Sequence, residues 1–237
     1  MKGFRFIFCA IIFLVVIAGA TERNLLDNTQ IISKITTTQK VVALTIDDGP
    51  HNKVTPEILA ILRDKHVKAT FFVLGVNVEK FPQILAQEVT DGHEIGLHTY
   101  SHPLLTNLSK NRITEEFEKA EKVILPMVSK PTLFRPPGGS YNSQVLEVAH
   151  QRGYRAILWS IDTRDWSCPP NPQIIDTIFK EIKPGSIILM HDGQYPIPTP
   201  QVLSTIIDGL RERGYEFVTV SELLQYNEVR HSVQFLD

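Results

Sequence analysis

The stretch Val41-Val42-Ala43-Leu44-Thr45-Ile46-Asp47-Asp48-Gly49-Pro50 decides the fold of this 237-residue chain. Its first six residues are apolar or β-branched without alternation, which is typical of a strand buried on both faces. Two carboxylates follow, and Gly49-Pro50 then predicts a sharp turn. At such a turn the side chains of Asp47 and Asp48 point in different directions, so one can hold a cation while the other accepts a proton. An ordinary turn without a catalytic role would use the same residues.

Short apolar runs of the same kind recur along the chain and predict seven strands. They cover residues 41–46, 70–74, 94–97, 132–135, 155–159, 186–190 and 216–218. Stretches with apolar residues at helical spacing separate them, for example residues 58–62 and 202–210. Strands that alternate with helices pair in parallel, because a parallel neighbour needs a long return connection. An open doubly wound sheet and a closed barrel both fit this alternation.

The positions of the polar residues favour the barrel. Five of them lie at or just beyond the carboxyl ends of five different predicted strands: Asp47, His98, Arg135, Asp162 and His191. In a barrel those ends converge on one mouth, whereas an open sheet spreads them along a crevice. We therefore predict a barrel of seven units, incomplete relative to the common eight.

Two histidines are candidate nitrogen ligands for a metal ion, although two histidines at such a spacing also occur by chance on many surfaces. His98 and His102 are four residues apart, and on one turn both imidazoles would project to the same side and reach one ion. A nearby carboxylate would complete a set that leaves positions open for water and substrate. This set suits Zn²⁺, and Co²⁺, Ni²⁺ or Fe²⁺ would accept it as well. The other histidines considered are expected to be solvated or structural: His51, His66, His93, His150 and His231.

Composition excludes several classes of protein. With 43% hydrophobic and 21% charged residues, the chain can bury one sizeable core and is neither disordered nor collagen-like. A formal net charge of -2, with acids and bases interspersed, provides no extended basic surface. We therefore expect no nucleic-acid partner.

The first twenty residues predict export. Lys2 and Arg5 precede a continuous apolar run, and Ala18-Gly19-Ala20 offers the small residues that a signal peptidase reads. We expect cleavage after Ala20, with an uncleaved N-terminal anchor as the alternative and as the one route to a membrane. Residues 21–39 form a predicted linker or arm, and residues 40–237 form the domain. After cleavage, Cys168 is the one cysteine left, so an intrachain disulfide is excluded and a loop thiol is expected.

Five motifs occur together in order along the chain. They are Thr45-Ile46-Asp47-Asp48-Gly49-Pro50, His98-Thr99-Tyr100-Ser101-His102, Arg135-Pro136-Pro137-Gly138-Gly139, Asp162-Thr163-Arg164-Asp165-Trp166 and Leu189-Met190-His191. The set resembles the motifs of the polysaccharide deacetylases with a NodB-homology domain, a carbohydrate esterase type, and the likeness extends over residues 40–225. This resemblance implies an α/β fold, a deformed seven-stranded (β/α) barrel in a single domain. It also implies removal of N-acetyl or O-acetyl groups from a glycan with the help of one divalent metal ion.

The resemblance also implies roles for individual residues. Asp48, His98 and His102 match the family's metal ligands. Asp47 matches its catalytic base, and His191 matches its general acid. One ion at the ligands would activate a water molecule and polarise the acetyl carbonyl.

Four further residues match supporting positions. Arg135 and Asp165 correspond to the pair that orients the base and the acid, and a direct ion pair between these two is one expectation. Trp166 would line the pocket for the acetyl methyl group. Gly138 stands where the family often has Tyr, so its backbone N–H would still bind the oxyanion while a sugar-facing side chain is missing. Ile46 stands where Phe is frequent, at a strand position that tolerates volume changes.

Two other functions stay open on the sequence. The chain could be an inactive, carbohydrate-binding relative, or a metal-dependent hydrolase of small cyclic amides. The expected partner is an acetylated polysaccharide, with peptidoglycan or a chitin-like glycan, poly-N-acetylglucosamine and acetylated xylan as the candidates. Peptidoglycan or another envelope glycan leads, because the signal has a bacterial character. The expected location is therefore the periplasm, the cell envelope or the medium.

Overall fold

The computed structural model describes residues 31–228. The predicted signal peptide and residues 21–30 of the predicted arm lie outside the described residues, so cleavage and the domain boundary stay predictions. Residues 32–35 run along the domain: Ile32 forms a bridge with Ile157, Lys34 forms one with Ser186, and Ile35 is buried. Within the described range, no helix has both the length and the hydropathy needed to cross a membrane.

One parallel sheet of eight strands organises the described residues. The strands are β1 (Val41–Asp47), β2 (Thr70–Val73), β3 (Glu94–Leu97), β4 (Leu133–Phe134), β5 (Arg155–Ala156), β6 (Ile161–Asp162), β7 (Ile187–His191) and β8 (Glu216–Val218). Seven of them follow the order β5-β4-β3-β2-β1-β7-β6, and β8 pairs with β1. All seven predicted strands are present. Strand β6 is additional, and its two residues are too few to show a periodicity.

Strand β1 lies at the centre of this sheet. Its first half, Val41–Ala43, pairs with β8, and its second half, Thr45–Asp47, pairs with β2 on the same edge. The other edge pairs with β7 from Ala43 to Asp47. All seven residues of β1 are buried, which explains why this stretch lacks the alternation of a half-exposed strand.

The sheet curls until its two outer strands are joined by a short piece of chain. Strands β5 and β6 are neighbours in sequence but lie at opposite ends of the strand order. The segment 157–160 crosses between them: the Ile157 N–H donates to the Phe134 carbonyl at 2.8 Å, and the Ser160 N–H donates to the Ile187 carbonyl at 3.0 Å. The fold is therefore the predicted deformed (β/α) barrel, closed by irregular chain where a regular barrel has a ladder.

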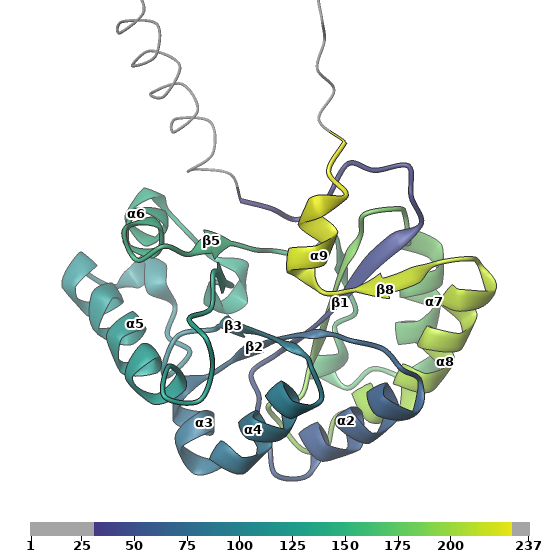
Figure 1. The fold of residues 1–237 in the computed structure, drawn as a ribbon, viewed down its shortest axis with the longest axis horizontal. Helices are drawn as coiled ribbons and strands as arrows, with labels where there is room; N and C mark the ends of the chain where they lie inside the picture. The colour runs from purple at the N-terminus through teal and green to yellow at the C-terminus, as the bar shows by residue number, and fades with distance from the viewer. Residues whose placement is uncertain (1–30, 229–237) are drawn as a thin grey trace, which may run out of the picture. The chain divides into compact units, whose positions relative to one another are not determined.

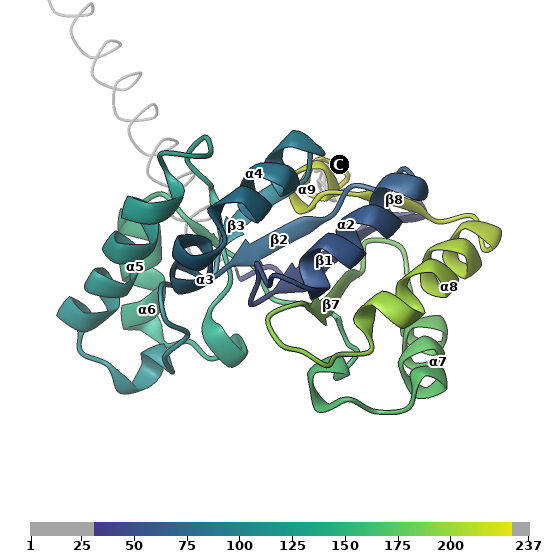
Figure 2. The ribbon, with the colours of Figure 1, turned by 90° about the horizontal axis from the view of Figure 1, so that it is seen from below.

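Helices surround the outer side of the curled sheet (Figures 1 and 2). They are α2 (Val54–Asp64), α3 (Gly75–Lys80), α4 (Pro82–Thr90), α5 (Lys110–Ile124), α6 (Ser143–Gln151), α7 (Asn171–Glu181), α8 (Thr199–Glu212) and α9 (Val220–Gln225). Three short 3₁₀ segments lie in loops: η1 (Leu105–Asn107), η2 (Pro137–Gly139) and η3 (Asp165–Ser167). Helix α9 packs Val220 and Leu223 into an apolar cluster with Ile35 and Val41. Val41 is the first residue of β1, so this apolar cluster covers the amino ends of the strands. The polar residues lie at the opposite, carboxyl ends.

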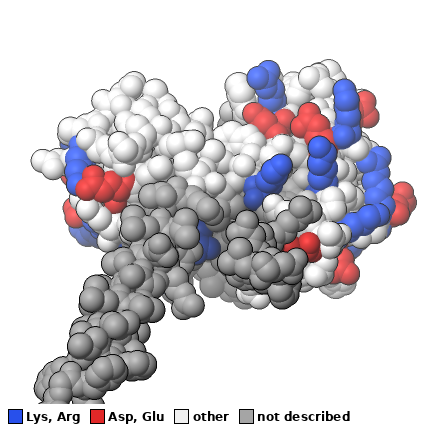
Figure 3. Space-filling view, turned by 90° about the horizontal axis from the view of Figure 1, so that it is seen from above, with Lys and Arg blue, Asp and Glu red and all other residues white. Residues whose placement is uncertain are grey.

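Charged side chains are mixed on the molecular surface. Figure 3 shows one face, on which the described Lys and Arg side chains are interspersed with Asp and Glu. Ion pairs such as Arg63–Asp91 and Lys65–Asp208, each at 2.7 Å, follow the same pattern. Binding of nucleic acid by counterion release requires an extended area of positive charge. The described part of that face carries no such area.

Candidate active site and metal centre

The two adjacent aspartates diverge because of an unusual backbone at Asp48. Asp47 is the last residue of β1 and is 2% exposed. Asp48 follows with φ at 75°, in the left-handed region, so its side chain leaves the alternation of the strand. Such a conformation costs about 1–3 kcal/mol and needs support from its surroundings. The Asn77 side-chain amide donates to the Asp48 carbonyl at 2.7 Å, and Gly193 packs so closely against Asp48 that a side chain there would clash.

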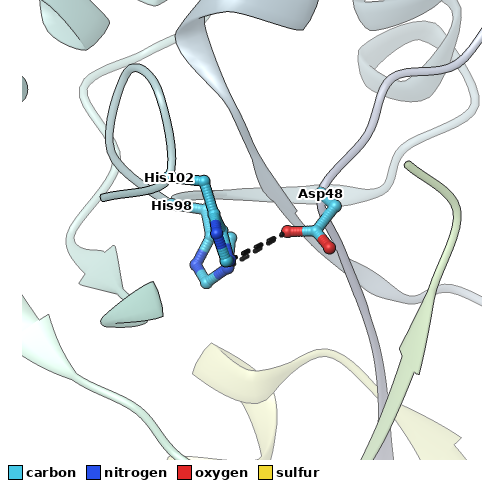
Figure 4. A group of neighbouring side chains, drawn as sticks. All are labelled: Asp48, His98 and His102. Carbon is cyan, nitrogen blue, oxygen red and sulfur yellow. Dashed lines mark ion pairs between the residues drawn. The ribbon is translucent and has the colours of Figure 1, made fainter. Parts of the chain in front are cut away.

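Three side chains form a cluster suited to a metal ion (Figure 4). The Nε2 atoms of His98 and His102 each lie 3.4 Å from Asp48 Oδ1, which is buried and has no hydrogen-bond partner. Two atoms that bind a tetrahedral ion at about 2.1 Å stand about 3.4 Å apart. The spacing and the orphaned oxygen therefore fit one divalent cation held by one oxygen and two nitrogen ligands.

The charges around this cluster favour a cation. Burial acts to raise the pKa of Asp48, but the close approach and charge of His98, whose Nε2 lies 3.4 Å from Oδ1, outweigh it and lower the pKa to about 2. Burial acts to lower the pKa of His98, and the charges of Asp47 and Asp48 outweigh it, so that pKa is raised. His98 Nδ1 lies 2.7 Å from the Arg135 carbonyl oxygen, an acceptor, so Nδ1 carries a proton and Nε2 is the atom that would bind an ion.

The two histidines come together through a loop and not through a helical turn. Residues 98–103 are irregular, with positive φ at Thr99 and His102, so the expected turn is wrong although the rings do meet, with centroids 5.0 Å apart. Glu116 of α5 holds the loop by accepting bonds from the Tyr100 N–H at 3.1 Å and the Ser101 N–H at 2.9 Å. Tertiary contacts therefore set the ligand geometry.

Arg135 lies at the centre of the barrel and is fully buried. Its guanidinium donates to Asp47 Oδ1 at 2.6 Å and to the Thr45 hydroxyl at 2.8 Å. It also donates to the carbonyls of Ile157 and Leu158, at 3.2 and 2.9 Å. Arg135 therefore ties β1 to the segment that closes the barrel. Its carboxylate partner is Asp47, so the expected direct pair with Asp165 is wrong.

Asp165 pairs with His191 instead. Asp165 Oδ1 lies 2.7 Å from His191 Nδ1, and Oδ2 accepts from the His191 N–H at 2.8 Å and from the Thr199 hydroxyl at 2.5 Å. Burial acts to lower the pKa of His191, but the hydrogen bond and charge of Asp165 outweigh it and raise the pKa to about 9. At neutral pH this histidine is therefore protonated, with Nε2 turned away from Asp165.

Gly138 and Trp166 occupy loops at the same end of the barrel. Gly138 lies in η2 with φ at 61°, a conformation that favours glycine, and a side chain there would meet nothing within 4 Å. Trp166 lies in η3 beside Asp165 and is 51% exposed. Asp162 is placed differently from the other strand-end residues, since its carboxylate accepts from the Arg164 N–H at 2.9 Å and shapes the turn towards Asp165.

Three further residues support the site, and the sequence assigned none of them a role, although Thr45 and Asp192 lie within or directly after its motifs. The Thr45 hydroxyl accepts from Arg135, and the Thr199 hydroxyl donates to Asp165. Asp192 is fully buried and accepts from the Thr55 hydroxyl at 2.5 Å. Burial and the negative charges of Asp48 and Asp47 raise its pKa to about 7, against the opposing effect of the Thr55 bond. The sequence signals were the position of Thr45 two residues before Asp47, on the same face of the strand, and an acid directly after His191.

Known proteins resemble the chain over most of its length. A sequence model of the family described as polysaccharide deacetylase matches residues 34–157. A peptidoglycan-N-acetylglucosamine deacetylase of Bacillus cereus is 40% identical over 191 residues, which cover 79% of this chain and 90% of that protein. A chitooligosaccharide deacetylase of Azorhizobium caulinodans is 38% identical over 197 residues, covering 77% and 94%. The crystal structure of the Bc1960 peptidoglycan N-acetylglucosamine deacetylase, bound to a benzamide compound, superposes with a TM-score of 0.79 at 34% identity, covering 83% and 94%.

Replacing Arg135 by Lys tests its contacts at the centre of the barrel. A lysine ammonium can reach Asp47, but it leaves the carbonyls of Ile157 and Leu158 buried without donors. We expect the free energy of unfolding to fall by about 2–5 kcal/mol, measured by urea denaturation. Arg155→Lys, at an exposed position in β5, is the matched control and should change it by less than about 0.5 kcal/mol. Equal effects of the two substitutions would contradict the contacts described.

Asp165→Asn tests what sets the protonation of His191. Without the carboxylate, burial dominates, and the pKa of His191 should fall from about 9 to its ordinary 6.5 or below. Since the folded-state pKa lies above the unfolded one, the stability that the pair contributes is full below pH 6.5 and is lost as pH rises to about 9. NMR titration of the imidazole in metal-free protein measures the shift. An unchanged pKa would show that another group controls His191.

Proposed function

The chain belongs to the polysaccharide deacetylase family, and we propose that its substrate is the N-acetylglucosamine of peptidoglycan or of a related envelope glycan. It is a hydrolase that removes N-acetyl groups from a polysaccharide. One observation carries the catalytic proposal: the Asp48–His98–His102 cluster has the buried Asp47 carboxylate beside it, and the protonated His191 faces the same barrel end.

In the proposed mechanism, Asp47 acts on the attacking water beside the metal-binding group of Asp48, His98 and His102. Asp48, His98 and His102 would hold the ion, which when bound would supply Lewis acidity to activate water and polarise the acetyl carbonyl. Asp47 Oδ1 is occupied by Arg135 at 2.6 Å, while Oδ2 lies 3.8 Å from His98 Nε2 and therefore faces the cluster. Asp47 Oδ2 is thus the proposed base that takes the proton of the water.

His191 completes the reaction at the leaving group. Its Nδ1 is held by Asp165, so Nε2 is free to donate its proton to the departing amine nitrogen. The raised pKa, about 9, keeps that proton available at neutral pH. An amine leaves poorly without a proton, so this step is worth about a hundredfold or more in rate. Thr199 acts indirectly, because it fixes the Asp165 carboxylate.

Two loop residues are proposed to bind the acetyl group. The backbone N–H of Gly138 would donate to the oxyanion that forms when the carbonyl is attacked. Trp166 would pack its ring against the acetyl methyl group. Both follow the family resemblance and lie in loops at the carboxyl ends of the strands.

Zinc is the proposed native ion. One carboxylate and two neutral imidazoles suit Zn²⁺, and the same donors accept Co²⁺, Ni²⁺ and Fe²⁺. Export is proposed as well, because peptidoglycan lies outside the cytoplasmic membrane and the first twenty residues have the order of a signal peptide.

Acetate release from a panel of substrates tests the proposed function. We expect release from peptidoglycan fragments and from chitin oligosaccharides, and no ring opening of small cyclic amides such as hydantoin, followed by liquid chromatography. Chelation should abolish the activity, and Zn²⁺ should restore it. Hydrolysis of the small amides alone would support the alternative metal hydrolase, and glycan binding without acetate release would support the inactive relative.

The division of roles between the adjacent aspartates can be tested directly. Asp48→Asn replaces a charged ligand by a neutral one, so it should lower bound metal and activity together, with partial rescue by excess zinc. Asp47→Asn should keep the metal and reduce kcat at least a hundredfold with KM little changed. His191→Ala should also keep the metal and should be less impaired on acetate esters. Metal content by mass spectrometry and deacetylation kinetics, measured on the three variants, test which aspartate is the ligand and which is the base. If Asp47→Asn lost the metal while Asp48→Asn kept it and was inactive, the two roles would be reversed.

A further inference from the structure

Two loops that carry site residues interlock beside the metal cluster. The β1–α2 loop follows Asp48, and the β7–α8 loop follows His191. Gly49 of the first packs against the Asp192 carboxylate, and Gly193 of the second packs against Asp48, with no room for a side chain at either glycine. Residues a few positions further along these loops therefore lie at the edge of the same site.

Tyr195 and Lys53 meet at that edge. Tyr195 of the β7–α8 loop is 60% exposed, and its ring stacks on His51 with centroids 6.5 Å apart and planes 7° apart. The Lys53 ammonium, from the β1–α2 loop, lies 4.5 Å from the centroid of the Tyr195 ring. A cation and a neighbouring ring hold the phenol in place while most of it remains in solvent.

The Lys53 ammonium is not paired with a carboxylate among the described residues. Within residues 31–228 its ammonium forms no ion pair or hydrogen bond, and its contact is the Tyr195 ring. Lys65 and Lys110, in contrast, pair with carboxylates at 2.7 and 2.6 Å. A positive charge on a loop at the edge of the site, held in place and not paired with a described carboxylate, is suited to an anionic group of the substrate.

Exposed aromatic rings gather at this end of the barrel. Among the described Phe, Trp and Tyr side chains, the exposed ones are Tyr141 after β4, Trp166 after β6 and Tyr195 after β7. The loops that carry the last two are tied together, since the Gln194 side-chain amide donates to the Trp166 carbonyl at 2.8 Å. The loops that carry Trp166 and Tyr195 are therefore held together, and both rings are exposed for contact with a sugar.

We propose that Lys53 and Tyr195 form a subsite for the residue next to the N-acetylglucosamine being deacetylated, with the Lys53 ammonium paired to a carboxylate of that residue or of its attached peptide. The inference rests on the proposed function of the neighbouring site. A muramyl residue without a stem peptide carries such a carboxylate on its lactyl group, and where a stem peptide is attached the peptide supplies the carboxylates, whereas chitin is neutral. The subsite therefore selects the acidic glycan.

The test compares an acidic and a neutral oligomer in matched variants. The substrates are a peptidoglycan fragment of alternating N-acetylglucosamine and peptide-bearing N-acetylmuramic acid, and chitotetraose. Lys53→Met should lower the acidic-to-neutral ratio of kcat/KM about five- to tenfold, mainly through KM, while Lys53→Arg should keep it within about twofold. Lys40→Met is the control, because Lys40 also lies over a tyrosine, Tyr215, but at the amino end of β1.

Salt provides a second measurement. Raising NaCl from about 0.05 to 0.5 M should lower the ratio for the wild type and leave that of Lys53→Met unchanged, because screening acts on the charge pair. Tyr195→Ala should raise KM for both oligomers, since it removes the stacking surface.

Several outcomes would overturn the subsite. An unchanged ratio in Lys53→Met would do so, and an equal loss on both oligomers would show a structural role. A wild type that deacetylates chitotetraose but not the acidic fragment would overturn it while leaving the deacetylase activity intact. If the wild type acts on neither, the proposed function fails, and calorimetric binding of the acidic fragment to the wild type and to Lys53→Met still decides the subsite.

Discussion

The buried ion pair between Arg135 and Asp47 is the interaction on which both the barrel and the site depend. The guanidinium reaches β1 through Asp47 and Thr45, and it reaches the closing segment through the carbonyls of Ile157 and Leu158. It also lies over the Phe72 ring, 4.2 Å from the centroid. A buried charge is costly unless it is paired and hydrogen-bonded, so these partners must assemble together. The same contact that closes the barrel therefore fixes the Asp47 carboxylate beside the Asp48–His98–His102 group.

Two histidines with the same side chain differ in the partner of Nδ1. For His98 the partner is a neutral carbonyl, and Nε2 is directed at the carboxylate of Asp48, where it would bind an ion. For His191 the partner is the Asp165 carboxylate, which raises the pKa to about 9 and leaves Nε2 with a proton to donate. The proposed ligand and the proposed acid are thus distinguished by the residues behind them.

Backbone strain is concentrated at the same end of the barrel. Among the described residues other than glycine, six have positive φ, and five of them lie in loops that follow β1, β3 and β6: Asp48, Thr99, His102, Arg164 and Cys168. Such conformations persist where surrounding contacts determine them, as Asn77 and Gly193 do for Asp48. The fold therefore stabilises loop geometries that the local sequence disfavours.

The sequence by itself determined the strands, their parallel pairing and the residues at their carboxyl ends, because continuous apolar runs and strand-end polar residues are local patterns. It missed β6, which has two residues, and it placed His98 and His102 on a turn that the structure replaces with a loop. Only the tertiary structure decided that Arg135 pairs with Asp47, 88 residues away, and Asp165 with His191, 26 residues away. Those choices follow from how strands β1, β4 and β7 and the closing segment converge, and no local pattern encodes that convergence.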